Sequence, residues 1–472
     1  MVLFVQSCGR PEKEMEVGGV KEPGGRPRRV LMLSWEYPPR IVGGIARHVA
    51  ELSQALAEKG LVVDVVTAHH PEAEVEEEIP ASSGEGIVRV LRGAAQPINA
   101  LDFVGEIHQL DFGLLERVMR DWGRGDVAGG KPEGRAGMGM PALQTYDVIH
   151  AHDWLVAFAA RTLRHGLDVP LVATIHATEA GRQGGIHTPM QRYIHSVEWL
   201  LTYDAWRVIC CSRAMTGEVQ LGLRVPPDKL RVIPNGVDPK RMRCADKPKE
   251  LAEYRRRWAR EDERIILFVG RLVREKGAEV LIEALPEVLA AHPEAKLVVA
   301  GGGWWGHLAG RAAALGIGHK VAFAGFVPEE DLPRLYAVAE VAVFPSLYEP
   351  FGIVALEAMA AGKAVVTSDI GGFREVVRHE ETGLQTWANN AGSLGWGIKR
   401  VLGDAALAAR LRRNGQREAA ARFGWAGIAE ETVTVYEEVL GLAEAGHRPA
   451  APEAGPGIRP RYLALSEAAR RS

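Results

Sequence analysis

Several features that would assign this 472-residue chain to a specialised class are scarce or missing. Its four cysteines show neither the spacing of a zinc site nor a disulfide framework, and the adjacent Cys210 and Cys211 close an apolar run typical of a buried strand. No apolar run approaches the roughly 20 residues that span a bilayer. The apolar patch at residues 1–6 is too short for a signal peptide. We therefore expect a protein of the reducing cytoplasm with no integral membrane segment.

An excess of charge of one sign is missing too. The chain carries 57 basic and 60 acidic residues, for a formal net charge of -3. This balance gives no general attraction to nucleic acid or to anionic lipid. The hydrophobic content of 47% and the length are instead typical of a large globular protein with two to three domains.

Apolar runs alternate with amphipathic stretches, and this alternation predicts two α/β units built on parallel sheets. In the first unit, a strand at 29–34 leads through Gly43 and Gly44 into a helix, and a second strand follows at 61–67. Further strands of this unit are expected at 148–150, 171–174, 207–210 and 230–233. The second unit should have strands near 265–270, 296–300, 321–324, 341–344 and 364–367, and helices over 407–422 and 426–441.

Changes in composition predict the domain boundaries. Residues 1–27 are charged and rich in Gly and Pro, so we expect a disordered leader. The first domain should cover 28–234, interrupted by a Gly-rich mobile loop at 123–142. Pro234-Asn-Gly then marks the hinge to a second domain at 235–444, and residues 445–472 are expected to form a flexible tail.

The stretch Glu349-Pro-Phe-Gly-Ile-Val-Ala-Leu-Glu357 is the most informative part of the chain. It follows an apolar run typical of a buried parallel strand, and a helix is predicted from Ile353. Gly352 then stands where a strand end becomes a helix start, a place where free N–H groups and the helix dipole suit a phosphate. Glu349 precedes this turn and Glu357 lies about two helical turns beyond it, so each could bind sugar hydroxyls. The alternative is two solvated glutamates on a surface helix.

A second strand-like run, residues 265–270, leads into two cations. Arg271 follows it directly, and Lys276 comes at the start of the next predicted helix. Open α/β sheets bind ligands at the carboxyl edge of their strands. There, the planar fork of Arg and the point charge of Lys both suit phosphate oxygens. The alternative is a pair of solvated cations near Glu275.

With these motifs in place, the chain resembles the retaining glycosyltransferases of family 4, and within them the glycogen and starch synthases in their archaeal-like form. The resemblance rests on segments that keep the family's order through most of the chain. They are Ser34–Gly44, His150–Trp154, Thr174–His176, Pro234–Asp238, Gly270–Arg271 with Lys276–Gly277, Glu349–Glu357, Gly371–Val377 and Glu381–Gly383. Membership implies the GT-B fold of the α/β class. Its two Rossmann-like domains face each other across a cleft, and a C-terminal helix crosses back to the first domain.

The resemblance also implies roles for individual residues. Glu349 would contact the hydroxyls of the donor sugar, and Glu357 would contact the ribose. The other donor-binding residues would be Gly352, Ile353 and Val354 at the distal phosphate, Phe326 and Val327 at the base, and Gly43 and Gly44 approaching the diphosphate from the first domain.

His152 completes the expected catalytic set of His152, Glu349, Arg271 and Lys276. It lies just past a predicted strand end and would line the cleft near the donor sugar and the acceptor. Without the resemblance, a hydrogen-bonded histidine at a strand terminus would be the ordinary interpretation. His176 and Glu179 are the candidates on the acceptor side.

No metal ion and no cofactor are expected. Many sugar-nucleotide enzymes hold a metal with an Asp-x-Asp pair, and this sequence contains no such pair. Arg271, Lys276 and the turn at Gly352 would stabilise the charge of the leaving phosphate instead. The donor substrate would be ADP-glucose or UDP-glucose.

The predicted function is therefore metal-independent, retaining transfer of a hexose, most simply glucose, from a nucleotide diphosphate sugar to an α-glucan. One departure leaves room for other acceptors, because Ile41 stands where glycogen synthases carry the lysine of Lys-x-Gly-Gly; the neighbouring Arg40 could supply that charge. Transfer to a lipid, a small polyol or a phosphosugar is the alternative. An inactive sugar-binding homologue is the alternative of another class. Trp304 and Trp305 could be a sugar-stacking platform, although helical core aromatics are the favoured interpretation.

Overall fold

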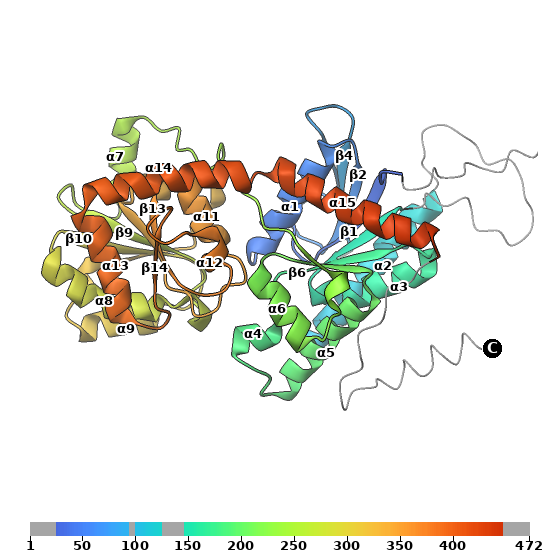
Figure 1. Cartoon of the computed structure of the whole chain (residues 1–472), viewed down its shortest axis with the longest axis horizontal. Coiled ribbons are helices and arrows are strands. Elements are labelled where there is room, and N and C mark those ends of the chain that lie inside the picture. Colours follow the sequence, from blue (N-terminus) through green and yellow to red (C-terminus); the bar gives the residue numbers. More distant parts are fainter. Residues whose placement is uncertain (1–24, 94–99, 125–145, 447–472) are drawn as a thin grey trace, which may run out of the picture.

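The structure, a computed structural model, describes residues 25–93, 100–124 and 146–446. Within these ranges the chain forms two α/β domains, each built on its own sheet (Figure 1). The sheets are parallel apart from one edge strand, and their central strands are buried on both faces because helices cover them. The predicted pair of Rossmann-like domains is confirmed.

The first domain has an eight-stranded sheet in the order β3-β4-β2-β1-β5-β6-β7-β8. Its strands are β1 Arg29–Leu33, β2 Val62–Thr67, β3 Glu76–Pro80, β4 Ile87–Arg92, β5 Val148–His152, β6 Leu171–Ile175, β7 Arg207–Cys210 and β8 Leu230–Val232. Its helices are α1 Gly44–Ala57, α2 Phe103–Arg124, α3 Ala157–Leu167, α4 Glu179–Gln183, α5 Pro189–Asp204 and α6 Arg213–Gly222.

The second domain has a six-stranded sheet in the order β11-β10-β9-β12-β13-β14. Its strands are β9 Arg264–Val269, β10 Ala295–Ala300, β11 Val321–Gly325, β12 Val341–Phe344, β13 Ala364–Ser368 and β14 Leu384–Thr386. Its helices are α7 Pro248–Arg255, α8 Ala278–Ala291, α9 Gly306–Ala314, α10 Leu332–Val338, α11 Ile353–Ala360, α12 Phe373–Val376, α13 Ala391–Gly403 and α14 Ala405–Arg422. Counted from β9, this is the 3-2-1-4-5-6 order of the Rossmann fold.

The chain passes between the domains twice, and the two crossings touch. The backbone N–H of Val237, in the first crossing, donates to the carbonyl oxygen of Phe423 in the second at 2.8 Å. Gly236 has no room for a side chain, since a Cβ would lie 2.5 Å from the ring of Trp425. The last helix, α15 (Trp425–Glu444), then packs beside α1 on the first domain (Figure 1). The predicted crossing back of the C-terminal helix is confirmed.

Every predicted strand is present, with ends that differ by a few residues at most. β3, β4 and α2 lie in a stretch for which no elements were predicted. Residues 123 and 124 belong to α2, so the mobile loop predicted from residue 123 starts too early. The rest of that loop, residues 125–142, lies outside the described residues, as do most of the predicted leader and tail. No helix in the described ranges combines the length and the apolar content needed to cross a bilayer.

Candidate active site

Two loops at the carboxyl edge of the second sheet meet at an ion pair. The Nζ atom of Lys276 lies 2.7 Å from Oε2 of Glu349, which also accepts a hydrogen bond from Oγ of Ser346 at 3.2 Å. Glu349 is only 7% exposed. The loops follow β9 and β12, the neighbours at which the strand order reverses, and α/β sheets bind their ligands at such a point. The structure thus brings Lys276 and Glu349 together where a ligand is expected.

The turn at Gly352 begins α11. Its φ is 107°, and a Cβ there would lie 2.4 Å from the ring of Phe373, so only glycine fits. The first N–H groups of α11, at Ile353 and Val354, have no acceptor within the helix. The start of α1 in the other domain lies close by, because a Cβ on Gly44 would be 2.9 Å from Cδ1 of Ile353. Two helix N-termini therefore come together, and both favour an anionic group.

Arg271 lies on the loop that carries Lys276 but is half exposed, and among the described acidic residues its ion-pair partner is Glu275 at 3.5 Å. Glycines after β10 support this loop. A Cβ on Gly301 would lie 1.7 Å from the carbonyl oxygen of Gly270. The run Gly301-Gly-Gly-Trp-Trp-Gly306 has the spacing of a dinucleotide-binding fingerprint. In this structure the first glycine, Gly301, lets the backbone after β10 pack closely against the loop that carries Arg271.

Glu357 is buried and paired with a residue that the sequence analysis did not single out. Its carboxylate forms an ion pair with Nη1 of Arg47, which lies on α1 of the first domain. Nε of Arg47 also lies 3.4 Å from Glu329. The carboxylate expected to bind ribose is thus held by a cation from the opposite domain. The one available signal was the position of Arg47, which follows Gly44 by three residues on the helix predicted to meet the diphosphate.

The loop after β11 presents an aromatic ring to solvent. Phe326 is 69% exposed, while Val327 packs partly against the core. Trp304 and Trp305, after β10, are also exposed, and the ring of Trp305 stacks on that of Phe323 with centroids 5.0 Å apart. The interpretation of these two tryptophans as helical core aromatics is therefore wrong.

Four histidines gather at the carboxyl edge of the first sheet: His48 on α1, His150 and His152 on β5, and His176 just after β6. His150 is fully paired, with Nδ1 2.7 Å from the Tyr436 hydroxyl and Nε2 2.7 Å from Oγ1 of Thr174. Burial lowers the pKa of all four histidines, that of His176 to about 3. The cluster is therefore uncharged at neutral pH.

His152 is fully buried and touches His176, with 3.2 Å between Nδ1 of the first and Nε2 of the second. Its Nε2 atom has no hydrogen-bond partner among the described residues. It is therefore not the fully paired strand-end histidine that the alternative interpretation requires. The loop after β1 lies beside it in the sheet, because β1 and β5 are neighbours.

Asp153 holds the backbone of His176 in place. Its carboxylate accepts the backbone N–H of His176 at 2.7 Å and lies 3.7 Å from Nη2 of Arg182. Burial raises the pKa of Asp153 to about 6. Glu179 is buried at the start of α4, where its backbone N–H donates to Glu198 at 2.7 Å. His176 thus contacts His152, whereas Glu179 lies further along the chain, at the start of α4.

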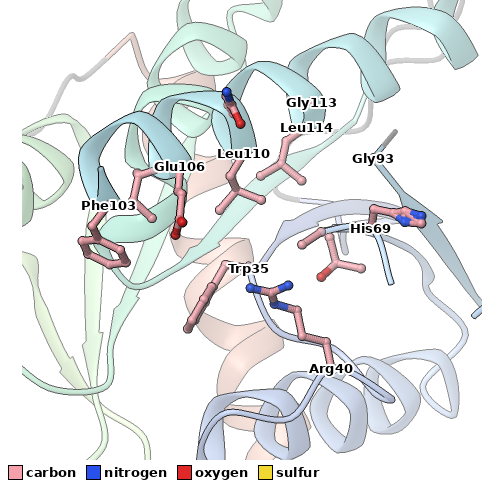
Figure 2. Close-up of a pocket in the computed structure, with 13 residues that line it drawn as sticks. Trp35, Arg40, His69, Gly93, Phe103, Glu106, Leu110, Gly113 and Leu114 are labelled. Carbon is pink, nitrogen blue, oxygen red and sulfur yellow. The ribbon is translucent and has the colours of Figure 1, made fainter. Parts of the chain in front are cut away.

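A cavity of about 380 Å³ opens between the loop after β1 and helix α2 (Figure 2). The guanidinium of Arg40 stacks on the ring of Trp35 with 5.0 Å to the centroid, and Glu106 points toward them from α2. Three polar atoms around the cavity are buried without a hydrogen-bond partner among the described residues: Trp35 Nε1, Arg40 Nε and Thr67 Oγ1. Arg40, the proposed substitute for the missing lysine, thus lines a cavity suited to a small polar ligand.

The comparisons with known proteins agree with this architecture. Residues 42–241 match the family model described as Glycosyltransferase Family 4, and residues 252–418 match the one described as Glycosyl transferases group 1. An uncharacterized glycosyltransferase of Methanocaldococcus jannaschii is 38% identical over 87% of this chain and 98% of its own length. The glycogen synthase of Mycobacterium tuberculosis is 37% identical over 86% of this chain and 94% of its own.

A more distant relative and a solved structure are also similar to this chain. A D-inositol 3-phosphate glycosyltransferase of Acidothermus cellulolyticus is 29% identical over 88% of this chain and 91% of its own length. The sucrose-phosphate synthase of Thermosynechococcus elongatus has a TM-score of 0.71 at 26% identity, covering 87% of this chain and 99% of its own. Sequence, topology and the domain pair agree, and the chain belongs to the family 4 glycosyltransferases with the GT-B fold.

Proposed function

We propose that this glycosyltransferase transfers glucose from ADP-glucose or UDP-glucose to an α-glucan, with retention of configuration and without a metal ion. The observation that carries the proposal is the ion pair between Lys276 and the buried Glu349 beside the N-terminus of α11. The likeness to a glycogen synthase over nearly the whole of that protein supports the choice of acceptor.

The geometry suits a reaction in which negative charge grows on a leaving diphosphate. Lys276, Arg271 and the free N–H groups of α11 would stabilise that charge as preoriented groups. Glu349 would bind hydroxyls of the glucose. The acceptor hydroxyl would attack the anomeric carbon on the face from which the phosphate leaves. The carbon–phosphate-oxygen bond breaks, the new glycosidic bond forms, and the acceptor proton passes to the leaving phosphate.

The cavity at Arg40 favours a second candidate, transfer to a phosphosugar. The unpartnered Nε of Arg40 and the nearby Trp35 Nε1 are both hydrogen-bond donors, which suit the acceptor atoms of a phosphate. The inositol phosphate glycosyltransferase among the relatives makes this acceptor class reasonable to test. The hydroxyl oxygens of a neutral glucan end could accept hydrogen bonds from the same two donors.

A transfer assay separates the two candidates. Labelled ADP-glucose and UDP-glucose are each incubated with glycogen, with maltooligosaccharides and with a panel of hexose and inositol phosphates. We expect label in the glucans, and we expect Arg40→Gln to lower that transfer only modestly. Transfer to a phosphorylated acceptor, lost in Arg40→Gln, would establish the second candidate instead. Arg374→Gln, a change at an exposed cation of the second domain, serves as the matched control.

A further inference from the structure

Three of the four clustered histidines are arranged around a common point. One ring nitrogen from each of His48, His152 and His176 lies within 4.8 Å of the corresponding atoms of the other two. Their ring centroids are 4.7 to 5.4 Å apart. We propose that His48, His152 and His176 form a binding site for a transition-metal ion of the zinc class, one that the transfer reaction does not need.

The spacing already resembles that of metal ligands. In a tetrahedral site with Zn–N bonds of about 2.0–2.1 Å, two ligand nitrogens lie roughly 3.3–3.4 Å apart. Nδ1 of His152 and Nε2 of His176 are 3.2 Å apart. The ligand nitrogen of His48 lies within 4.8 Å of both. Three imidazoles would leave a fourth position for water, as at zinc sites with an open position.

The hydrogen bonding separates His48 from His150. His48 is 5% exposed, and neither of its ring nitrogens has a hydrogen-bond partner of good geometry among the described residues, although Asn235 lies beside it. A buried polar ring without partners is costly. His150, in contact with His152, has both nitrogens paired and is not available. His48 is therefore unpaired, whereas His152 and His176 hydrogen-bond each other through two nitrogens that a metal ion could take in place of that contact. Both nitrogens of His150 serve the fold.

The charges nearby set the class of ion. Arg182 approaches His176 and opposes any cation, but Asp153 lies 3.7 Å from its guanidinium and offsets that charge. The ligands themselves are neutral imidazoles, which suit Zn²⁺, Cu²⁺ and Ni²⁺, whereas Mg²⁺ and Ca²⁺ require oxygen ligands. A bound ion would be coordinated by His152, whose side chain is proposed to face the donor sugar. We therefore expect zinc to compete with the donor and inhibit transfer.

Metal binding by the full-length chain tests this proposal without any substrate. Protein freed of metal by chelation is titrated with Zn²⁺ against a chromophoric chelator, and with Co²⁺ while its visible absorption is recorded. We expect one equivalent of either ion, with the intense d–d bands of a four-coordinate Co²⁺ site. His48→Gln and His176→Gln should each weaken binding by more than the roughly 10–100-fold that loss of a supporting outer-shell contact costs. His307→Gln, at an exposed histidine of α9, should bind as the wild type does.

Thermal unfolding of each metal-free variant shows whether it folds. Should His48→Gln fail to fold, the His176→Gln variant carries the test, because His176 is partly exposed and follows the strand. Wild-type protein that binds no equivalent of Zn²⁺, or binding that both folded variants retain, would overturn the site. Zinc inhibition that saturating donor does not relieve would overturn the competition.

Discussion

At the scale of single residues, Lys276 and Arg271 differ in how tightly the protein holds them. Lys276 pairs with the buried Glu349, whereas Arg271 is half exposed with a distant partner. Both are proposed to act on charge that grows in the transition state. We expect Lys276→Ala and Arg271→Ala each to lower kcat/KM on the order of 10²–10³-fold, with kcat reduced as well as KM raised.

Initial-rate kinetics over a range of donor concentrations measures both effects. Arg274→Ala removes an exposed cation from the same loop and should leave the rates nearly unchanged. A folded Lys276→Ala or Arg271→Ala variant with near-normal kcat would show that the lost side chain is a solvated surface cation.

Arg47 gives a prediction of a different kind, because it neutralises the buried Glu357 from across the domains. Removing one partner of a buried ion pair costs about 3 kcal/mol or more, since the other charge is left without compensation. Arg47→Ala should therefore lower the unfolding temperature of the free protein. Arg241→Ala, which removes an exposed arginine paired with Glu51 and Glu329, should change it little.

Adding nucleotide tests whether Glu357 also binds the ribose. If the ribose hydroxyls bind Glu357, they replace the contact that Arg47→Ala loses, so UDP or ADP should stabilise this variant more than the wild type. Differential scanning fluorimetry with and without nucleotide makes the comparison. Equal stabilisation of both proteins would argue against ribose binding at Glu357.

At the scale of elements, helix α2 carries a buried carboxyl group that should make the stability of the protein depend on pH. Asp111 is 3% exposed and accepts the backbone N–H of Ala159, in the first turn of α3, at 2.9 Å. Burial raises the pKa of Asp111 to about 7. The folded state then binds a proton on Asp111 more tightly than the unfolded chain does, because the pKa of an unfolded Asp is about 3.9. The stabilisation is complete below the unfolded pKa and is lost as pH rises to about 7.

Asp111→Asn should remove this dependence while keeping the acceptor for Ala159. Between about pH 4 and pH 7, Asp111 should cost the wild type on the order of 1 kcal/mol of stability per pH unit. The variant should therefore gain stability relative to the wild type at pH 8 but not at pH 4. Urea unfolding at the two pH values measures it. A constant difference would show that Asp111 titrates normally.

The elements also show what the sequence could and could not predict. Apolar runs such as Val341–Phe344 became buried parallel strands because both faces of the sheet are covered. The sequence did not predict β3 because Glu76–Pro80 is charged and exposed and has no apolar pattern. It is an edge strand that is held by its pairing with β4. The loops bearing Lys276 and Glu349 could be predicted from their place after strands. The pairing of Arg47 with Glu357 could not, because it depends on how the two domains meet.

At the scale of the whole molecule, the two domains are joined at several points around the proposed donor site. Oγ of Ser212 in the first domain donates to the carbonyl oxygen of Pro350 at 2.6 Å, and the backbone N–H groups of Arg213 and Ala214 each donate to Glu375 at 3.1 Å. The covalent links are the two adjoining crossings of the chain, at Val237 and Phe423. Hydrogen bonds and the two crossings thus hold the domains together beside this site.

We propose that cations and helix N-termini of this domain pair support glucosyl transfer without a metal. The most direct measurement is incorporation of labelled glucose from ADP-glucose or UDP-glucose into glycogen in the presence of EDTA, followed by digestion with an α-1,4-specific amylase. Glu349→Gln, which keeps the shape of the side chain but removes its charge, is the matched variant. We expect undiminished incorporation under EDTA, release of the label by the amylase, and strong loss in Glu349→Gln. Transfer that stops on chelation and returns with Mg²⁺ or Mn²⁺ would contradict it.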